Sequence, residues 1–149
     1  MTKILFVCHG NICRSPMAEF VMKKICKDNN INFEIASAAT STEEIGNPVH
    51  HGTKRVLSSH GIDCTGKTAR QMTKSDYEYY DYIVAMDRFN LRNMIKFVGD
   101  DPQNKVSLLM SFTDRPGDVA DPWYTGDFET TWNDVFEGCN GLFEYIENK

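Results

Sequence analysis

Short apolar runs alternate with amphipathic stretches along the whole chain. The run at residues 3–7 is almost continuously apolar and stops at a turn that contains glycine, as is typical of a central strand in a parallel sheet. Similar short runs predict strands at 33–36, 82–85 and 106–109. Apolar residues at helical spacing predict a helix that begins at Ser15, a good N-cap residue, and helices that cover 48–60, 74–79, 87–97 and 128–146. Asp87 can cap the helix at 87–97. The chain is therefore expected to alternate strands with helices.

This alternation predicts the fold class. Parallel strands joined through helices have right-handed crossovers, so four strands favour an α/β fold with a doubly wound four-stranded parallel sheet and helices on both faces. The sequence contains no internal repeat, linker or low-complexity segment. We therefore expect residues 1–149 to form a single three-layer domain. Ligands of such sheets bind beyond the carboxyl ends of the strands, which directs attention to the residues that follow residue 7.

Composition and charge indicate the class of protein and the binding partners that can be expected. Hydrophobic residues make up 41% and charged residues 25% of the chain, the balance of a globular protein rather than a disordered or membrane protein. The net charge of -5 is spread without a long block of one sign, so no nucleic acid or membrane partner is expected. The apolar run at the N-terminus is too short for a signal peptide, which predicts a cytoplasmic protein. The oligomeric state stays open.

The cysteines separate into two groups. Their number is odd and no secretion signal precedes them, which argues against a disulfide framework. Cys26 and Cys139 fall on apolar helical stripes and are expected in the core. Cys8 and Cys13 lie in a more unusual setting, at the end of the first strand. No spacing of cysteine and histidine completes a zinc set, so neither a metal nor another cofactor is expected.

The segment with the strongest chemical pattern is CHGNICRS, at residues 8–15. A loop of this length can curl so that its N–H groups join the free amides of the helix N-terminus in a concave anion site, for which phosphate is a natural guest. The same amides and Arg14 would favour the thiolate of Cys8, a nucleophile. The planar guanidinium of Arg14 can hold two phosphoryl oxygens. A buried strand end beside a surface arginine would explain neither Gly10 nor Asn11.

Residues 8–16 resemble the low-molecular-weight protein tyrosine phosphatases, whose N-terminal loop has the pattern Cys-x-Gly-Asn-x-Cys-Arg-Ser-Pro. The pattern matches throughout. The resemblance extends to Ala-Arg-Gln at 69–71, to Tyr-Ile-Val-Ala-Met-Asp at 82–87 and to Asp-Pro-Trp-Tyr at 121–124, which is similar to the acid loop of the family. It therefore spans essentially the whole chain.

The resemblance implies a role for each matching residue. Cys8 would be the nucleophile, Arg14 would bind phosphate and stabilise the transition state, and Ser15 would help the thiolate to leave. Asn11 would hold the shape of the loop. Asp121 would protonate the departing phenol and then activate water against the phosphocysteine, although a turn aspartate before proline is the simpler alternative. Backbone groups would contact the phosphate from His9, Gly10, Asn11, Ile12, Cys13 and Arg14.

Further residues complete this expectation. Trp123 and Tyr124 would form an aromatic wall deep enough for phosphotyrosine but not phosphoserine, unless Trp123 packs in the core. The family implies that Cys13 can trap an oxidised Cys8 as a reversible disulfide. Ser37 is the candidate for a distant serine that supports the loop. Many relatives carry a histidine in the same network, near the position of Lys67 in this chain.

A second wall of the site is expected at residues 41–44. Glu43 and Glu44 make this segment acidic where vertebrate relatives often carry an aromatic residue, which would disfavour acidic phosphopeptides. The resemblance implies that the partners are phosphotyrosine-containing proteins or peptides, with inorganic phosphate as product and competing ligand.

The expected activity is phosphotyrosine hydrolysis through a phosphocysteine on Cys8, but three other functions fit parts of the pattern. Arsenate reduction would need further relay cysteines, and Cys64 is a poor candidate. Protein-arginine phosphatases carry threonine where this chain has Ile12. A phosphopeptide-binding module without turnover would not need Asp121.

Overall fold

One parallel sheet organises the protein, and its strands follow the order β2-β1-β3-β4. The computed structural model describes residues 1–149. All neighbouring strands pair in parallel, with Phe6 opposite Ser37 on one side and Val84 on the other. The strands are β1 (Lys3–Cys8), β2 (Glu34–Ala39), β3 (Tyr82–Ala85) and β4 (Val106–Leu108). The predicted four-stranded parallel sheet is confirmed.

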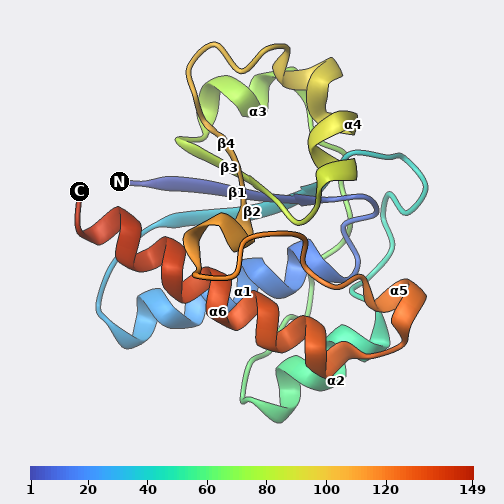
Figure 1. The fold of residues 1–149 in the computed structure, drawn as a ribbon. Helices are drawn as coiled ribbons and strands as arrows, with labels where there is room; N and C mark the ends of the chain where they lie inside the picture. The colour runs from blue at the N-terminus through green and yellow to red at the C-terminus, as the bar shows by residue number, and fades with distance from the viewer.

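Helices cover both faces of this sheet, as the doubly wound fold requires. Figure 1 shows α3 and α4 on one side of the strands and α1, α2 and α6 on the other. No helix combines the length and the apolarity needed to cross a membrane. The helices are α1 (Arg14–Asp28), α2 (His51–Ser59), α3 (Lys74–Tyr79), α4 (Arg88–Val98), α5 (Pro122–Thr125) and α6 (Phe128–Glu147), with a 3-10 turn at Leu109–Phe112.

The side chains of β1 divide between two cores because successive residues of a strand point to opposite faces. Ile4 and Phe6 join the larger cluster, together with residues of α1 and α6, whereas Leu5 and Val7 join the smaller cluster, together with residues of α3 and α4. All four are 0% exposed. The strand that carries Cys8 at its end is therefore fixed from both faces.

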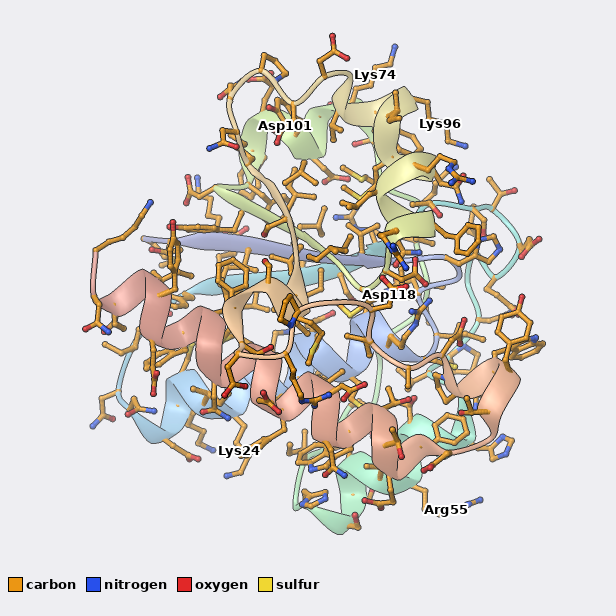
Figure 2. The ribbon with its side chains drawn as sticks, in the orientation of Figure 1. Lys24, Arg55, Lys74, Lys96, Asp101 and Asp118 are labelled. Atoms are coloured by element: carbon orange, nitrogen blue, oxygen red, sulfur yellow. The ribbon has the colours of Figure 1, made fainter.

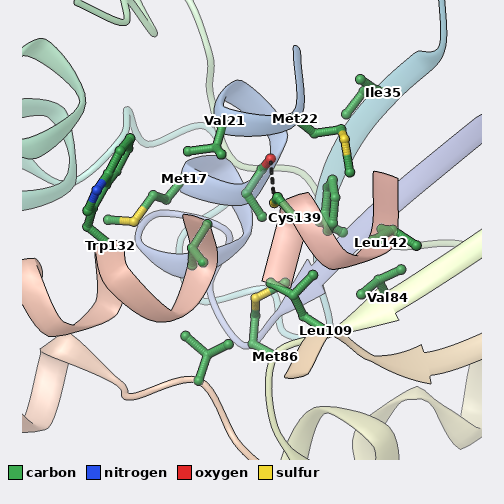
Figure 3. Packing of buried hydrophobic residues seen from close by; sticks show 14 of the residues in the cluster. Met17, Val21, Met22, Ile35, Val84, Met86, Leu109, Trp132, Cys139 and Leu142 are labelled. Carbon is green, nitrogen blue, oxygen red and sulfur yellow. Dashed lines mark hydrogen bonds between the residues drawn. The ribbon is translucent and has the colours of Figure 1, made fainter. Parts of the chain in front are cut away.

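The larger core lies between α1, α6 and the sheet. Figure 3 shows Met17 and Met22 of α1 packed with Cys139 and Leu142 of α6, and all four side chains are 0% exposed. Cys26 is 4% exposed, so both cysteines that were expected in the core lie there. Charged side chains lie at the periphery, as Lys74 and Arg55 show in Figure 2. The apolar pattern of the sequence thus predicted the core correctly.

Two glycines within α6 mark its closest contacts with the rest of the protein. A Cβ on Gly138 would lie 2.5 Å from Cγ of Leu109, and one on Gly141 would collide with the backbone oxygen of Phe112. Glycine normally weakens a helix by about 1 kcal/mol relative to alanine. Here its small size allows α6 to approach the segment that follows β4.

Several element boundaries differ from the prediction. Strand β2 continues to Ala39, beyond the predicted end at residue 36, because Ser37 to Ala39 pair with the last residues of β1. Helix α2 begins only at His51, since Pro48 forms an isolated bridge with Thr68. Strand β4 ends at Leu108, and the short helix α5 was not predicted. Contacts between distant segments set the first two boundaries, whereas local turns set the other two.

Helix α1 begins one residue before the predicted start. Its first residue is Arg14 and its N-cap is Cys13, which makes no capping hydrogen bond through its side chain. Ser15 is therefore not the cap of this helix, because its hydroxyl lies next to Cys8 and Asn11 instead. The first turn of α1 consequently keeps its amides free, which shapes the site described next.

Candidate active site

The loop between β1 and α1 surrounds one end of a cavity. Cys8 ends β1 and Arg14 begins α1, and both line a pocket of about 590 Å³ together with most of the residues between them. The backbone N–H groups of residues 9–14 donate to no backbone carbonyl of the protein. Free amides in a curled loop at a helix N-terminus are a common binding arrangement for an anion. The loop can thus accept a phosphoryl group beside the sulfur of Cys8.

Arg14 is held in place on one edge of its guanidinium. Its side chain is buried, with Nη1 donating to Oδ2 of Asp87 at 2.8 Å and to the carbonyl of Val119 at 3.1 Å. Nη2 makes a longer contact of 3.4 Å with Oδ2 of Asp121. Because Nη1 has both of its hydrogens engaged, the edge formed by Nε and Nη2 remains for an anion.

The charge of Arg14 is matched by acidic groups around it. Burial alone would lower its pKa, but the acidic groups of Cys8, Asp121 and Asp87 together raise it above the ordinary value. A buried guanidinium without such neighbours would be costly, so these contacts stabilise the charge at the site. The arrangement brings the thiol, the guanidinium and the carboxylate of Asp121 to one pocket from three segments of the chain.

Asp87 has a second function that its sequence position did not reveal. The sequence predicted it as the cap of the helix at 87–97, and its Oδ1 does accept from the amide of Asn90 at 2.8 Å. Its Oδ2 binds Arg14 at the same time. The sequence indications were its place just after β3, at the same edge of the sheet as Cys8, and its position in the segment 82–87 that resembles the family.

Asn11 holds the middle of the loop in an unusual conformation. Its φ angle of 59° lies in the left-handed region, which side chains other than glycine rarely adopt without local hydrogen bonds. Its Oδ1 accepts from the amide of Arg70 at 3.2 Å, and its Nδ2 donates to Oγ of Ser15 and of Ser37 at 2.8 and 2.9 Å. The expected supporting contact between Asn11 and Ser37 is therefore present in the structure.

These hydrogen bonds have a defined direction. Because each serine oxygen accepts a hydrogen from Asn11, each serine keeps its own hydroxyl hydrogen for another partner. For Ser37 that partner is Oε1 of Glu19, at 2.5 Å. The hydroxyl of Ser15 lies 3.0 Å from Sγ of Cys8, and either atom can donate while Cys8 is a thiol. A thiolate can only accept, so Ser15 then directs its hydrogen at the sulfur.

A buried ion pair completes this network behind the loop. Nζ of Lys67 lies 3.5 Å from Oε1 of Glu19 and donates to the carbonyl of Ser37 at 3.0 Å. Burial lowers the pKa of Lys67, and the nearby Glu19 partly opposes this effect. Lys67 thus supports the network in the region where the family resemblance suggested a histidine. Glu19 was missed, although its place four residues after Ser15 puts it on the same buried side of α1.

The aromatic residues of the acid loop are exposed at the pocket. Trp123 and Tyr124 are 63% and 85% exposed, and both line the cavity, so Trp123 does not pack in the core. Asp121 caps α5, with its Oδ1 accepting from the amide of Trp123 at 3.1 Å. One turn therefore presents a carboxylate and two aromatic side chains to the same pocket.

The segment at 41–44 forms another wall of the pocket. Glu43 and Glu44 line the cavity, and Oε2 of Glu43 lies 2.6 Å from Nε2 of His9. The amide of Ser41 donates to the carbonyl of His9 at 3.1 Å, which fastens this segment to the loop after β1. The imidazole of His9 therefore makes an exposed hydrogen bond with Glu43 at the rim of the pocket.

Cys13 also lines the pocket but differs chemically from an activated thiol. Burial, followed by the charges of Cys8 and Asp121, raises the pKa of Cys13 to about 12. It therefore carries its proton at neutral pH. Thr53 donates to its carbonyl at 3.2 Å, so the helix α2 contacts this side of the loop.

The structure separates the predicted site residues into two sets. The predicted residues that line the pocket are Cys8, His9, Gly10, Ile12, Cys13, Arg14, Asp121, Trp123 and Tyr124. By contrast, Asn11 and Ser15 are 1% and 0% exposed, and their side chains lie behind the loop. Asn11 was expected to hold the loop and Ser15 to assist the Cys8 thiolate, and their side chains contact the residues that these roles require. Sequence analysis missed Phe89, Asn90 and Asn93, which line the pocket from α4. No group of three or more His, Cys, Asp or Glu residues is placed to hold a metal ion.

Comparisons with known proteins identify the family of this chain. The sequence model of the low molecular weight phosphotyrosine protein phosphatase family matches residues 3–149. A low molecular weight protein-tyrosine-phosphatase PtpA from Staphylococcus aureus is 39% identical over 148 residues, which is 98% of this chain and 94% of the relative.

Solved structures have the same fold over nearly the whole chain. The low molecular weight protein tyrosine phosphatase SP-PTP from Streptococcus pyogenes is 43% identical and superposes with a TM-score of 0.85, covering 99% of this chain and 98% of that one. YfkJ from Bacillus subtilis is 36% identical with a TM-score of 0.95, covering 99% and 96% of the two chains. The chain therefore belongs to the low molecular weight phosphotyrosine protein phosphatase family.

Proposed function

We propose that the protein hydrolyses phosphotyrosine in two steps through a phosphocysteine on Cys8. The observation that carries this proposal is the meeting of Cys8, Arg14 and Asp121 at one pocket, beside a loop whose amides are free. The three residues come from the end of β1, the start of α1 and the cap of α5. Residues 1–149 act as a single phosphatase domain in this proposal, because both cores draw on elements from the whole chain.

In the first step the thiolate of Cys8 attacks phosphorus and the bond between phosphorus and the tyrosine oxygen breaks. The free N–H groups of the loop and the Nε and Nη2 edge of Arg14 stabilise charge on the transferring oxygens. Asp121 gives its proton to the departing oxygen, which matters because the phenol of tyrosine has a pKa near 10 and leaves poorly as an anion. The products of this step are the free tyrosine and the phosphocysteine.

In the second step Asp121, now a carboxylate, takes a proton from water as the water attacks phosphorus. The bond between sulfur and phosphorus breaks, and its electron pair returns to Cys8 as a thiolate. The hydroxyl of Ser15, which directs its hydrogen at this sulfur from 3.0 Å, stabilises the leaving thiolate. Inorganic phosphate leaves and the enzyme returns to its starting state.

The walls of the pocket support an aromatic substrate. Trp123 and Tyr124 offer large exposed rings beside the loop, which suit the phenyl ring of phosphotyrosine better than a guanidinium or the short side chain of phosphoserine. Phosphotyrosine-containing proteins or peptides are therefore the proposed partners. The pocket contains no cysteine besides Cys8 and Cys13, and Cys64 is 4% exposed outside it, which leaves arsenate reduction without a further relay thiol.

The chemistry of Cys8 also favours one kind of cellular compartment. Cys8 must be reduced to act as a nucleophile, which supports a reducing compartment such as the cytoplasm. If Cys8 is oxidised to a sulfenic acid, the thiol of Cys13 at the same pocket can displace water from it and form a disulfide. Thiols would then restore the enzyme.

Replacement of Cys8 tests the nucleophile. Cys8→Ser should reduce turnover of phosphotyrosine by about 10⁴-fold or more, because a serine hydroxyl, unlike a thiol, does not ionise near neutral pH and is a much weaker nucleophile. The measurement is the steady-state rate with purified protein under reducing conditions and without added metal. Cys64→Ala, which changes a cysteine outside the pocket, should keep most of the activity. Undiminished turnover in Cys8→Ser would refute the proposed function.

Replacement of Asp121 tests the general acid. Asp121→Asn should lower kcat for phosphotyrosine by about 10²- to 10⁴-fold and have a smaller effect on an aryl phosphate whose phenol is acidic. Asp118→Asn is a matched control, since Asp118 lies in the same segment but pairs with Arg88 outside the pocket. An equal loss on both substrates would remove Asp121 from the acid role.

Replacement of Lys67 tests the network behind the loop. Lys67→Met leaves the carboxylate of Glu19, whose side chain is 6% exposed, with Lys23 as its only cation. We expect a loss of about 1–3 kcal/mol in the free energy of unfolding, together with a several-fold lower kcat. Urea denaturation and steady-state kinetics measure the two effects.

Lys24→Met is the control for this experiment. Lys24 lies on α1, the helix that carries Glu19, but pairs with Asp28 at the surface, with side chains that are 46% and 57% exposed. Its replacement should change the free energy of unfolding by less than about 0.5 kcal/mol. If Lys67→Met behaves like Lys24→Met in both measurements, the buried pair does not support the loop.

A further inference from the structure

Phe89 is a large apolar side chain that is exposed to solvent at the pocket. It is the second residue of α4 and is 66% exposed, although burial of a phenylalanine side chain stabilises a protein by about 1.5–3 kcal/mol. It lines the same cavity as Cys8. Because the exposed rings of Phe89, Trp123 and Tyr124 line the same pocket, they form an apolar surface of the kind that a ligand covers.

The start of α4 holds Phe89 in a fixed position. Asp87 caps the helix and binds Arg14, while Oδ1 of Asn90 accepts from the amide of Asp87 at 3.1 Å. The guanidinium of Arg92 lies 5.4 Å from the centre of the Phe89 ring, a favourable cation-π distance. The ring is thus placed relative to the phosphate site through Asp87 and is not on a free loop.

Phe89 and the aromatic residues of α5 approach the pocket from different directions. Figure 1 shows α4 and α5 on opposite sides of the loop that follows β1, and Trp123 and Tyr124 of α5 line the same cavity. The cavity of about 590 Å³ lies in the range that holds a drug-sized molecule, so it has room for more than one phosphorylated side chain. The rings of α5 already provide a wall for the phenyl ring of the substrate.

We infer that Phe89 is a specificity residue that binds an apolar side chain next to the phosphotyrosine of a peptide substrate. This inference rests on the proposed function. The phosphate fixes the phosphotyrosine at the base of the pocket, and the adjacent residue of the peptide reaches the mouth, where Phe89 is exposed. Burial of an apolar side chain against the ring removes both surfaces from water.

The test compares two phosphotyrosine peptides that differ only in the flanking residues, which are leucine in one and glycine in the other. The parent protein should have about tenfold higher kcat/KM for the leucine peptide, and Phe89→Ala should abolish this preference. Free phosphotyrosine is the reference substrate against which kcat/KM of the two peptides is compared for each protein. Phe89→Leu should restore part of the preference.

Ile95→Ala is the matched control, because Ile95 is 57% exposed on the same helix but does not line the pocket. It should leave the peptide preference unchanged. Both peptides can also be bound to the Cys8→Ser variant and to the Cys8→Ser/Phe89→Ala double variant. The affinities then show the preference for the leucine peptide without turnover. A failure of the parent protein to hydrolyse free phosphotyrosine would refute the proposed function, while this binding comparison would still test Phe89.

Two results would overturn the inference. A preference for leucine that survives Phe89→Ala, or the absence of any preference in the parent protein, would mean that Phe89 does not contact the flanking residue. An equal loss on free phosphotyrosine and on both peptides would mean that Phe89 contacts the phosphotyrosine itself.

Discussion

The hydrogen bonds of the Asn11 side chain are the constraint on which the active-site loop depends. A loop that leaves its amides free for a ligand gives up the hydrogen bonds that would otherwise hold its shape. Asn11 replaces them with bonds to Ser15, to Ser37 and to the amide of Arg70, and these also hold its left-handed backbone conformation. The amides can therefore face a phosphoryl group without a collapse of the loop.

The charged residues around this loop each have more than one contact. Asp87 fixes α4 and one edge of Arg14, so the helix that carries Phe89 and the guanidinium that faces the phosphate share one carboxylate. Glu19 receives the hydrogen of Ser37 and contacts Lys67. This sharing keeps the buried charges paired, which limits the cost of placing them behind the site.

Contiguous patterns in the sequence were sufficient for much of this structure. Strand β3 and helix α3 lie at the predicted residues, and the loop motif at residues 8–16 placed Cys8 at the end of a buried strand and Arg14 next to the following helix. Such features depend on neighbours within a few residues, so local periodicity and turn chemistry describe them well.

Features that depend on distant residues could not be predicted in the same way. The bond of Ser15 to Cys8 displaced it from its expected capping role, and the end of β2 depends on pairing with β1. Glu19 and Phe89 became visible only when the fold placed them beside the loop and the pocket. A single sequence gives the residue types for these contacts but not the distances that create them.

The most direct test of this account is a crystal structure of the protein with vanadate, which imitates phosphorus in the transition state. We expect vanadium bound to Sγ of Cys8, with Nε and Nη2 of Arg14 on two equatorial oxygens and the amides of residues 9–14 directed at the anion. Asp121 should face the apical oxygen opposite the sulfur. Vanadate bound away from Cys8, or an Arg14 that does not contact it, would contradict the central claim.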